Sequence, residues 1–243
     1  MAEADGWSTI AKEWAELWGD FANPVHERII AAAGIAEGSK VLDVGCGSGE
    51  FLRALEAAGA DAHGIDPAEG MVAAAGRGAQ LADAESIPWP DEEFDVVTAV
   101  NALQFAEDTM DALQEFARVL KPGGLVAISN WAESDLNDID SIESVLDEDD
   151  DGEEEEGELR VAGGLEQLLG DAGFELVEAG LVEAPWHAPD DDILVRGVLL
   201  GEDPDTQQAW ADVIKAAAEP FKVATGGYVL ANALRYAVAR KPS

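Results

Sequence analysis

The sequence has few basic residues and only one cysteine. Its 243 residues include 14 Lys and Arg against 51 Asp and Glu, which gives a formal net charge of −37. Nucleic acids and anionic membrane surfaces are therefore poor partners, because the protein as a whole would repel their phosphates. Cys46 has no second cysteine, which excludes an internal disulfide and a cysteine-based zinc site.

Long apolar runs are also missing. No segment reaches the roughly 18 consecutive apolar residues that a membrane-spanning helix needs. The first six residues, MAEADG, lack the basic and apolar regions of a secretory signal, so we expect a cytoplasmic protein. The hydrophobic content of 47% is nevertheless enough for a core, and the length fits one α/β domain.

The acidic residues are spread along the chain and are also gathered in one run. Residues 147–158, DEDDDGEEEEGE, are acidic apart from two glycines, so the segment 132–158 is predicted to be a solvated, mobile insertion. The run lacks the ligand spacing of a calcium loop, and no metal site is predicted. The excess of acid elsewhere indicates a protein from a halophile, because molar salt shortens the Debye length to about 3 Å and screens repulsion. An ordinary acidic protein with one solvated loop is the alternative.

Short apolar runs alternate with helical segments from Lys40 onward. This alternation is typical of a parallel sheet with crossover helices. Pro122-Gly123-Gly124 is predicted to be a turn between two elements. The predicted strands are 41–44, 61–65, 80–82, 94–100, 125–129, 174–182 and 228–239, the last as an edge hairpin partner, and the predicted helices are 50–58, 68–75, 109–120, 165–172 and 204–218.

Aromatic residues are concentrated near the N-terminus. Residues 7–21 place Trp7, Trp14, Trp18 and Phe21 along one helical stripe. The helix either packs on the core or forms a lid over a pocket, and these two roles are compatible.

The glycine-rich segment Asp43 to Glu50, DVGCGSGE, follows the first predicted strand and opens the first helix. Glycines there allow a ligand to approach the backbone amides closely, at the edge of the sheet where nucleotides bind. A dinucleotide is disfavoured, because Glu50 occupies the sixth position of G-x-G-x-x-G and Asp43 places a carboxylate near the pyrophosphate position. A ligand with a cationic end fits better.

Two further aspartates follow neighbouring strands. Asp66 lies 21 residues after Gly45 and can accept hydrogen bonds from both hydroxyls of an adenosine ribose. It could instead cap a helix that begins with Pro67. Asp83 can accept from the exocyclic amine of adenine, although an aspartate in a loop is most often only solvated.

Four motifs, in order, resemble those of class I S-adenosylmethionine-dependent methyltransferases, in particular the small-molecule methyltransferase-domain proteins. They are VLDVGCGSGE (41–50), GIDPAEGMV (64–72), ADAESIPWPDEEFDVVTAVNALQFAED (82–108) and RVLKPGG (118–124). The resemblance implies a Rossmann-like three-layer sandwich with a mostly parallel seven-stranded sheet and an antiparallel last strand. Together with the patterns above, it predicts one domain over 1–243: an N-terminal aromatic helix or lid (1–24), a cofactor-binding core (25–131), the acidic insertion (132–158), which departs from the family pattern, and the substrate-side and C-terminal strands (159–243).

The resemblance implies S-adenosyl-L-methionine as the cofactor and in-line methyl transfer to a small-molecule acceptor. It assigns Asp43 and the loop to the methionine portion, Asp66 to the ribose, and Asn101 to the region of the methyl donor. The cofactor-binding residues implied in this way are Asp43, Gly45, Cys46, Gly47, Asp66, Pro67, Met71, Asp83, Ala84, Asn101 and Gln104, with Phe105 close by.

A general base is needed only if the acceptor must lose a proton. His187 is the preferred candidate, because it lies in the substrate-side part and histidine titrates near neutral pH; Tyr228 is a weaker one. His63 is predicted to be structural, and His26 is left open between a structural and a functional role. A non-catalytic S-adenosylmethionine-binding sensor is the alternative function. A nicotinamide-dependent oxidoreductase is disfavoured by Glu50 and by the absence of a second catalytic domain.

Overall fold

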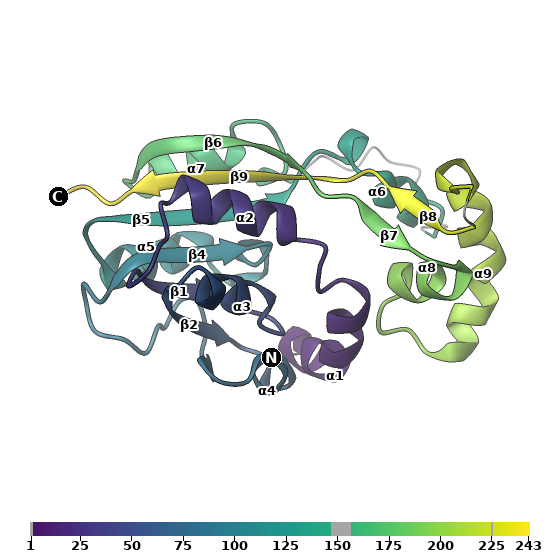
Figure 1. Cartoon of the computed structure of the whole chain (residues 1–243), viewed down its shortest axis with the longest axis horizontal. Helices are drawn as coiled ribbons and strands as arrows, with labels where there is room; N and C mark the ends of the chain where they lie inside the picture. Colours follow the sequence, from purple (N-terminus) through teal and green to yellow (C-terminus); the bar gives the residue numbers. More distant parts are fainter. Residues whose placement is uncertain (1, 147–156, 225) are drawn as a thin grey trace.

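The strands form a seven-stranded sheet in the order β3-β2-β1-β4-β5-β9-β6 (Figure 1). The computed structural model describes residues 2–146, 157–224 and 226–243. Neighbours among β1 to β5 pair in parallel, whereas β9 is antiparallel to both β5 and β6. The predicted sheet with its antiparallel last strand is confirmed. The strands are β1 (Lys40–Val44), β2 (Asp61–Asp66), β3 (Ala79–Leu81), β4 (Phe94–Val100), β5 (Leu120–Trp131), β6 (Glu175–Glu183) and β9 (Ala233–Arg240).

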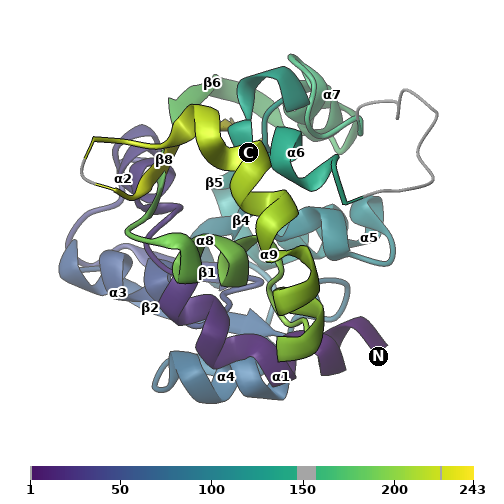
Figure 2. The same cartoon turned by 90° about the vertical axis from the view of Figure 1, so that its right-hand side faces the viewer.

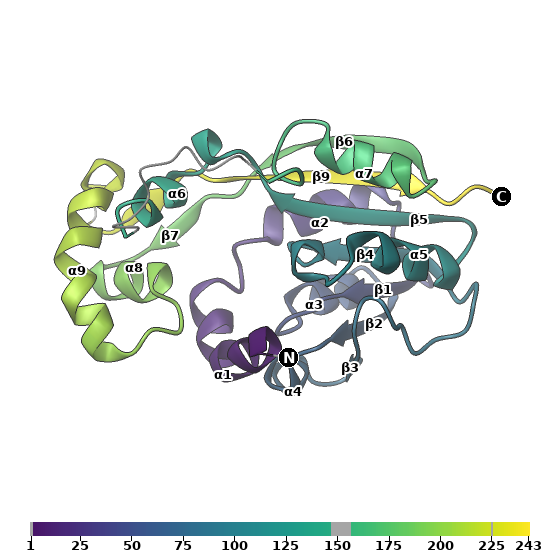
Figure 3. The ribbon, with the colours of Figure 1, turned by 180° about the vertical axis from the view of Figure 1, so that it is seen from behind.

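Helices cover both faces of this sheet. α2 and α3 lie on the face toward the viewer in Figure 1, and α5 and α7 lie on the opposite face, seen in Figure 3. The result is the predicted three-layer α/β/α sandwich. The helices are α1 (Ala2–Leu17), α2 (Asn23–Ala32), α3 (Glu50–Ala57), α4 (Glu69–Ala75), α5 (Thr109–Val119), α6 (Asp138–Glu143), α7 (Gly164–Asp171), α8 (Asp191–Val198) and α9 (Pro204–Ala218).

The local sequence explains how these elements form and pack. Asp108 begins α5, because its carboxylate accepts hydrogen bonds from the amides of Met110 and Asp111. Fully buried residues recur every three or four positions along the helix, and burial of a side chain such as Phe116 stabilises the fold by about 1.5–3 kcal/mol. In the strands, successive side chains point to opposite faces of the sheet. Val41 belongs to the core under α2 and α3, and Leu42 belongs to the core under α5 and α7.

A smaller group of elements lies beyond the carboxyl ends of β1 and β4. It contains α6, α8, α9 and a two-stranded sheet of β7 (Trp186–Ala188) and β8 (Tyr228–Leu230), and Figure 2 views it from the outside. Trp18, directly after α1, stacks on Trp186 with ring centroids 4.5 Å apart and donates a hydrogen bond to the Gly197 carbonyl. These contacts join the N-terminal segment to the C-terminal elements.

The prediction of a turn between two elements at Pro122-Gly123-Gly124 is wrong. It lies inside β5, where Phe94 pairs with Leu120 and Val96 with Leu125, so that four residues of β5 oppose one residue of β4. The carbonyl and amide of Lys241 pair with Gly123 and Gly124 and hold this bulge against the end of β9. A positive φ of 74° at Gly123 makes the bulge possible.

The predicted strand 228–239 is wrong in two respects. It divides into β8 and β9, which belong to different sheets, and β9 lies between β5 and β6 rather than at an edge. Two buried asparagines stabilise the break: Asn137 accepts a hydrogen bond from the Ala233 amide, and Asn232 accepts one from the Ile139 amide. No local pattern in the sequence marks these tertiary hydrogen bonds.

The acidic insertion is more structured at its start than predicted. Residues 134–136 form a short 3-10 helix and α6 follows, with Ile139 and Ile142 buried. Most of the acidic run, residues 147–156, lies outside the described residues, so its predicted mobility stays a prediction. Within the described part of the chain, none of the helices combines the length and apolar character needed to cross a membrane.

Candidate functional site

A cavity of about 1000 Å³ lies at the carboxyl ends of β1, β2 and β4 and extends toward α6 and α8. This is the edge of an open α/β sheet at which ligands generally bind. Every residue predicted to bind the cofactor lines it: Asp43, Gly45, Cys46, Gly47, Asp66, Pro67, Met71, Asp83, Ala84, Asn101 and Gln104, together with Phe105.

The glycine loop is shaped by two different requirements. Gly45, with φ of 70°, packs so closely on the end of β4 that an added Cβ would lie 2.3 Å from the Ala102 Cβ. Gly47, with φ of 52°, has open space where its Cβ would be, and its amide donates a 2.9 Å hydrogen bond to Asp66 Oδ2. The loop therefore requires glycine for backbone conformation at both positions and for packing at the first.

Asp66 connects the glycine loop to the segment after β2. Its Oδ2 accepts from the Gly47 amide and its Oδ1 accepts from the Ala68 amide, each at 2.9 Å. The alternative that it caps a helix beginning at Pro67 is wrong, because α4 begins at Glu69 and residue 68 occupies the N-cap position. A carboxylate has about four acceptor positions, so Asp66 can still accept two hydroxyl groups from a ligand.

Asp43 is a buried carboxylate at the bottom of the same cavity. The Thr98 hydroxyl donates a 2.7 Å hydrogen bond to its Oδ1. Burial raises the pKa of Asp43 to about 7, and the neighbouring carboxylates of Asp66 and Glu50 contribute to the rise. Arg160 is the only Lys or Arg among the described residues that line the cavity, and it pairs with Asp140. A ligand with a positive charge and a ribose, such as S-adenosylmethionine, therefore fits this lining.

Replacement of Asp43 by asparagine is expected to flatten the pH dependence of stability. Because the pKa of Asp43 in the folded protein lies above the ordinary aspartate value, the native state binds a proton that the unfolded chain has released between about pH 4 and 7. Stability contributed by Asp43 therefore falls as pH rises through this interval. Urea unfolding of the ligand-free protein at several pH values in constant molar KCl measures the slope.

Asp83→Asn is the matched control for this measurement, because Asp83 lines the same cavity but is exposed. The slope of the Asp83 variant should equal that of the original protein. Equal slopes in all three proteins would show that the Asp43 carboxyl titrates normally.

Asn101 follows β4 in a left-handed conformation, with φ of 50°. Asparagine tolerates this conformation better than most residues, and non-glycine residues with positive φ often occur at functional sites. The Gln104 side chain donates a 3.0 Å hydrogen bond to the Asn101 carbonyl, which holds the turn into the short helix η1 (Leu103–Phe105). Asn101 lines the cavity, and its Oδ1 accepts a 3.4 Å hydrogen bond from the Ser129 hydroxyl of β5.

Cys46 has a packing role at the base of the loop. Its Sγ would lie 2.8 Å from a Cβ added to Gly64, so the thiol fills the space above β2. Burial raises the pKa of Cys46, and the thiol stays protonated at neutral pH. It is therefore unsuited to nucleophilic chemistry.

The structure does not bring His187 or Tyr228 into the cavity. In β7, Trp186 and Ala188 are buried while His187 between them is exposed, as the alternation of a strand requires. Tyr228 is buried, and its hydroxyl donates a 2.8 Å hydrogen bond to Asp191. Neither residue lines the cavity, so their positions give no support to the predicted catalytic roles.

The second half of the cavity is lined by residues that the sequence reasoning mostly missed. They come from the N-terminal segment, α2, the start of α3, the end of β5, α6, α8 and the segment before α7. The aromatic stripe was a signal for the first of these, Glu50 belonged to the glycine-rich motif and His26 was left open, whereas no pattern marked the residues from β5, α6 and α8. This half, called the acceptor chamber here, is lined by Trp14, Trp18, Gly19, Phe21, Ala22, His26, Glu50, Phe51, Trp131, Ile139, Asp140, Glu143, Arg160, Gly197, Val198 and Leu200.

The N-terminal helix α1 packs on α4 and contributes Trp7 and Trp14 to the cavity wall, and its role as a lid stays a prediction. It rests on α4 so closely that a Cβ on Gly70 would lie 2.1 Å from the Ser8 carbonyl oxygen. Trp7 contacts Phe105 across the cavity edge, with ring centroids 5.6 Å apart and planes at 73°. Trp7 and Phe105 both line the cavity.

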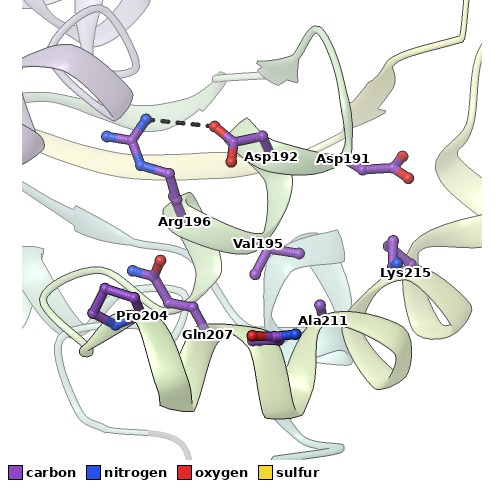
Figure 4. Close-up of a pocket in the computed structure, with 9 residues that line it drawn as sticks. Asp191, Asp192, Val195, Arg196, Pro204, Gln207, Ala211 and Lys215 are labelled. Carbon is purple, nitrogen blue, oxygen red and sulfur yellow. Dashed lines mark ion pairs between the residues drawn. The ribbon is translucent and has the colours of Figure 1, made fainter.

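A second pocket of about 320 Å³ lies between α8 and α9 (Figure 4). Arg196 on its wall pairs with Asp192 at 3.6 Å and also contacts Glu13 and Glu16 of α1. The pocket shares no lining residue with the larger cavity and contains none of the predicted site residues.

Residues 42–128 match the family model described as a methyltransferase domain. Cycloartenol-C-24-methyltransferase from Arabidopsis thaliana is 31% identical in an alignment of 193 residues that covers 68% of this chain and 54% of that protein. Malonyl-[acyl-carrier protein] O-methyltransferase from Yersinia pestis is 35% identical over 134 residues, or 51% of this chain and 50% of that protein. The chain spans about half the length of these curated relatives.

Solved structures share the fold at lower sequence identity. A SAM-dependent methyltransferase from Aquifex aeolicus has a TM-score of 0.52 and 19% identity, covering 95% of this chain and 97% of that one. The [4+2]-cyclase SpnF has a TM-score of 0.59 and 22% identity, covering 91% and 81%. A chain in a complex with the Haloferax volcanii Trm112 methyltransferase activator has a TM-score of 0.60 and 20% identity, covering 99% and 98%.

The fold is Rossmann-like and is shared with a SAM-dependent methyltransferase of known structure. Residues 42–128, which include the glycine loop, Asp66 and Asn101, are the part that is similar to the methyltransferase-domain family.

Proposed function

We propose that the protein transfers the methyl group of S-adenosylmethionine to a small-molecule acceptor by in-line displacement. The observation that carries this proposal is the continuity of one cavity. It joins the glycine loop, Asp43 and Asp66 to the aromatic acceptor chamber, so that two ligands can meet inside it. Its volume of about 1000 Å³ lies at the upper end of the range for small-molecule sites, which leaves room for a cofactor and an acceptor.

The residues of the cofactor half have complementary tasks in this proposal. Asp66 accepts the ribose hydroxyls with the acceptor positions that Gly47 and Ala68 leave free. Asp43 faces the positively charged methionine portion, and a cation there favours its ionised form. Asp83 and Ala84 contact the adenine edge. When bound, the cofactor supplies a methyl group already activated by its sulfonium.

The acceptor half would then work mainly by orientation. Because the methyl group needs no further activation, the walls of the chamber only have to hold the nucleophile in line and exclude competing water. Trp18, Phe21 and Trp131 form a rigid wall, since Phe21 stacks on Trp131 at 4.6 Å and both contact Trp18 edge-on. Rigid aromatic side chains lose little entropy when a ligand binds.

Binding of S-adenosylmethionine without methyl transfer is the alternative function. The [4+2]-cyclase SpnF has the same fold, and a fold alone does not define a reaction. A protein that binds S-adenosylmethionine as a sensor, without catalysis, would use the same cofactor half of the cavity.

Methyl transfer is tested with the full chain in molar KCl, methyl-labelled S-adenosylmethionine and a native metabolite extract filtered to remove macromolecules. The expected result is a labelled small molecule that forms only when the protein is present and that S-adenosylhomocysteine suppresses. Tight cofactor binding with no transfer would favour the sensor. Tighter binding of NADH than of S-adenosylhomocysteine would refute the cofactor assignment.

We also infer that the protein works in the cytoplasm on a small molecule, without a nucleic-acid or membrane partner. The net charge of −37 supports this, because phosphate-rich surfaces would be repelled.

A further inference from the structure

The polar groups of the acceptor chamber are almost all occupied by other protein groups. Glu50 accepts hydrogen bonds from the Ser48 hydroxyl and from Arg53. Arg160 pairs with Asp140, and Glu143 is also engaged. These charged side chains are therefore satisfied before a ligand enters.

His26 is different. It is 4% exposed, lines the chamber from α2, and stacks on Phe51 with ring centroids 4.4 Å apart and planes at 8°. Neither ring nitrogen has a hydrogen-bond partner among the described residues; Nδ1 is enclosed by protein, which leaves Nε2 as the nitrogen that can meet a ligand in the chamber. A polar group left without a partner lowers stability, so a ligand that hydrogen-bonds the imidazole is favoured in this chamber.

The imidazole is neutral at physiological pH, because burial lowers the pKa of His26 to about 4. A neutral imidazole has one donor nitrogen and one acceptor nitrogen. It can hold an N–H or O–H group by a hydrogen bond without adding a charge to the chamber. It is too weakly basic to attract an anion by protonation.

We propose that His26 binds the methyl acceptor, and that the acceptor is an uncharged, mainly apolar ring compound with an N–H or O–H group. This inference rests on the proposed function, since it assigns the second ligand of the same cavity. Trp14, Trp18, Phe21 and Trp131 provide apolar ring surface around the imidazole of His26. His26 is then an acceptor-positioning residue.

The charge of the cavity excludes anionic acceptors. Asp43, Glu50 and Asp66 lie along its wall, and the one basic side chain of the described lining is already paired with Asp140. A carboxylate in the chamber would be repelled by these side chains and would find no free basic side chain among the described residues of the lining. The curated relatives include enzymes named for a sterol and for a malonyl group, and this cavity suits the uncharged class.

The test measures binding rather than turnover, so that it is independent of whether methyl transfer occurs. The full chain is saturated with S-adenosylhomocysteine in molar KCl, and equilibrium dialysis gives the affinities of indole, 1-methylindole and indole-3-acetate. Indole should bind three- to tenfold more tightly than 1-methylindole, the effect of one neutral hydrogen bond. Indole-3-acetate should bind least tightly.

His26→Phe keeps the stacked ring and removes both nitrogens. It should lower the affinity for indole to that for 1-methylindole and leave the affinities for 1-methylindole and S-adenosylhomocysteine unchanged. His63→Phe is the matched control: His63 contacts Trp89 and Phe94 edge-on and lies outside the cavity, so its replacement should change none of these affinities.

Three results would overturn the inference. One is an equal effect of His26→Phe on indole and 1-methylindole, and another is a loss of S-adenosylhomocysteine affinity, which would place His26 at the cofactor. The third is the absence of binding by all three probes to protein that still binds S-adenosylhomocysteine. The comparison of indole with 1-methylindole in the unaltered protein needs no variant, so the test holds even if His26→Phe does not fold.

Discussion

Replacement of Asp66 by alanine is expected to weaken S-adenosylmethionine binding by about 5- to 150-fold. This corresponds to roughly 1–3 kcal/mol, the cost of leaving ribose hydroxyls without an acceptor in a buried site. Asp66 is 7% exposed and lines the cavity, and it also fixes the Gly47 amide of the glycine loop. Both losses act on the same ligand, which is why we expect a large effect from one side chain.

Titration calorimetry with S-adenosylhomocysteine measures this change. Asp61→Ala is the matched control, because Asp61 begins the same strand, carries the same charge and lies outside the cavity. Its affinity should be close to that of the original protein. If Asp66→Ala lowered stability but kept full affinity, Asp66 would be only a structural link between Gly47 and Ala68.

The melting temperature is expected to rise by more than about 10 °C between dilute buffer and molar KCl. For a chain of this size that rise corresponds to about 3–5 kcal/mol. The 51 acidic residues outnumber the 14 basic ones, so repulsion between carboxylates exceeds attraction at low salt. Molar salt reduces the Debye length from about 10 Å to about 3 Å and removes most of this repulsion.

The direction of the change in melting temperature shows whether repulsion between carboxylates or attraction within ion pairs contributes more to stability. Salt weakens ion pairs such as Glu133–Arg235 and Glu115–Arg118. This weakening alone would make the protein less stable. A net rise therefore identifies repulsion as the larger contribution. Sucrose at equal osmolality is the control and should reproduce only a small part of the rise. A melting temperature independent of KCl would remove the inference of a halophilic protein.

Most of the sheet was predictable because its signals are local. Alternating and continuous apolar runs define β1, β2 and β4, and the predicted ends of the helix 204–218 agree with α9 to the residue. The glycine loop was predictable for the same reason. Glycines between a strand and a helix need positive φ values, and Gly45, Gly47 and Gly49 have them.

Long-range contacts decided the features that were predicted wrongly. The bulge at Pro122-Gly123-Gly124 exists because the end of β9 pairs with it. The break between β8 and β9 exists because Asn137 and Asn232 bind backbone groups brought near by α6. These partners are about one hundred residues apart in the chain, so no local pattern marks them.

The histidines show the same limit at the site. His187 was preferred because it lies in the substrate-side part of the chain, but the pairing of β7 with β8 turns it toward solvent. His26, which the sequence left open, is buried against Phe51 on the wall of the cavity. The packing of α2 on α3 is what places His26 at the cavity wall while His187 lies outside the cavity.

By itself the sequence determined the class of fold, the glycine loop and the acidic residues that follow the first strands, because strand periodicity and glycine conformation are properties of neighbouring residues. It also determined the charge, and hence the expected dependence on salt. The tertiary structure alone decided which side chains share the cavity, since residues from α1, β5, α6 and α8 meet there only after the chain has folded. Burial, which makes Asp43 hard to ionise and His26 neutral, arises from that same assembly.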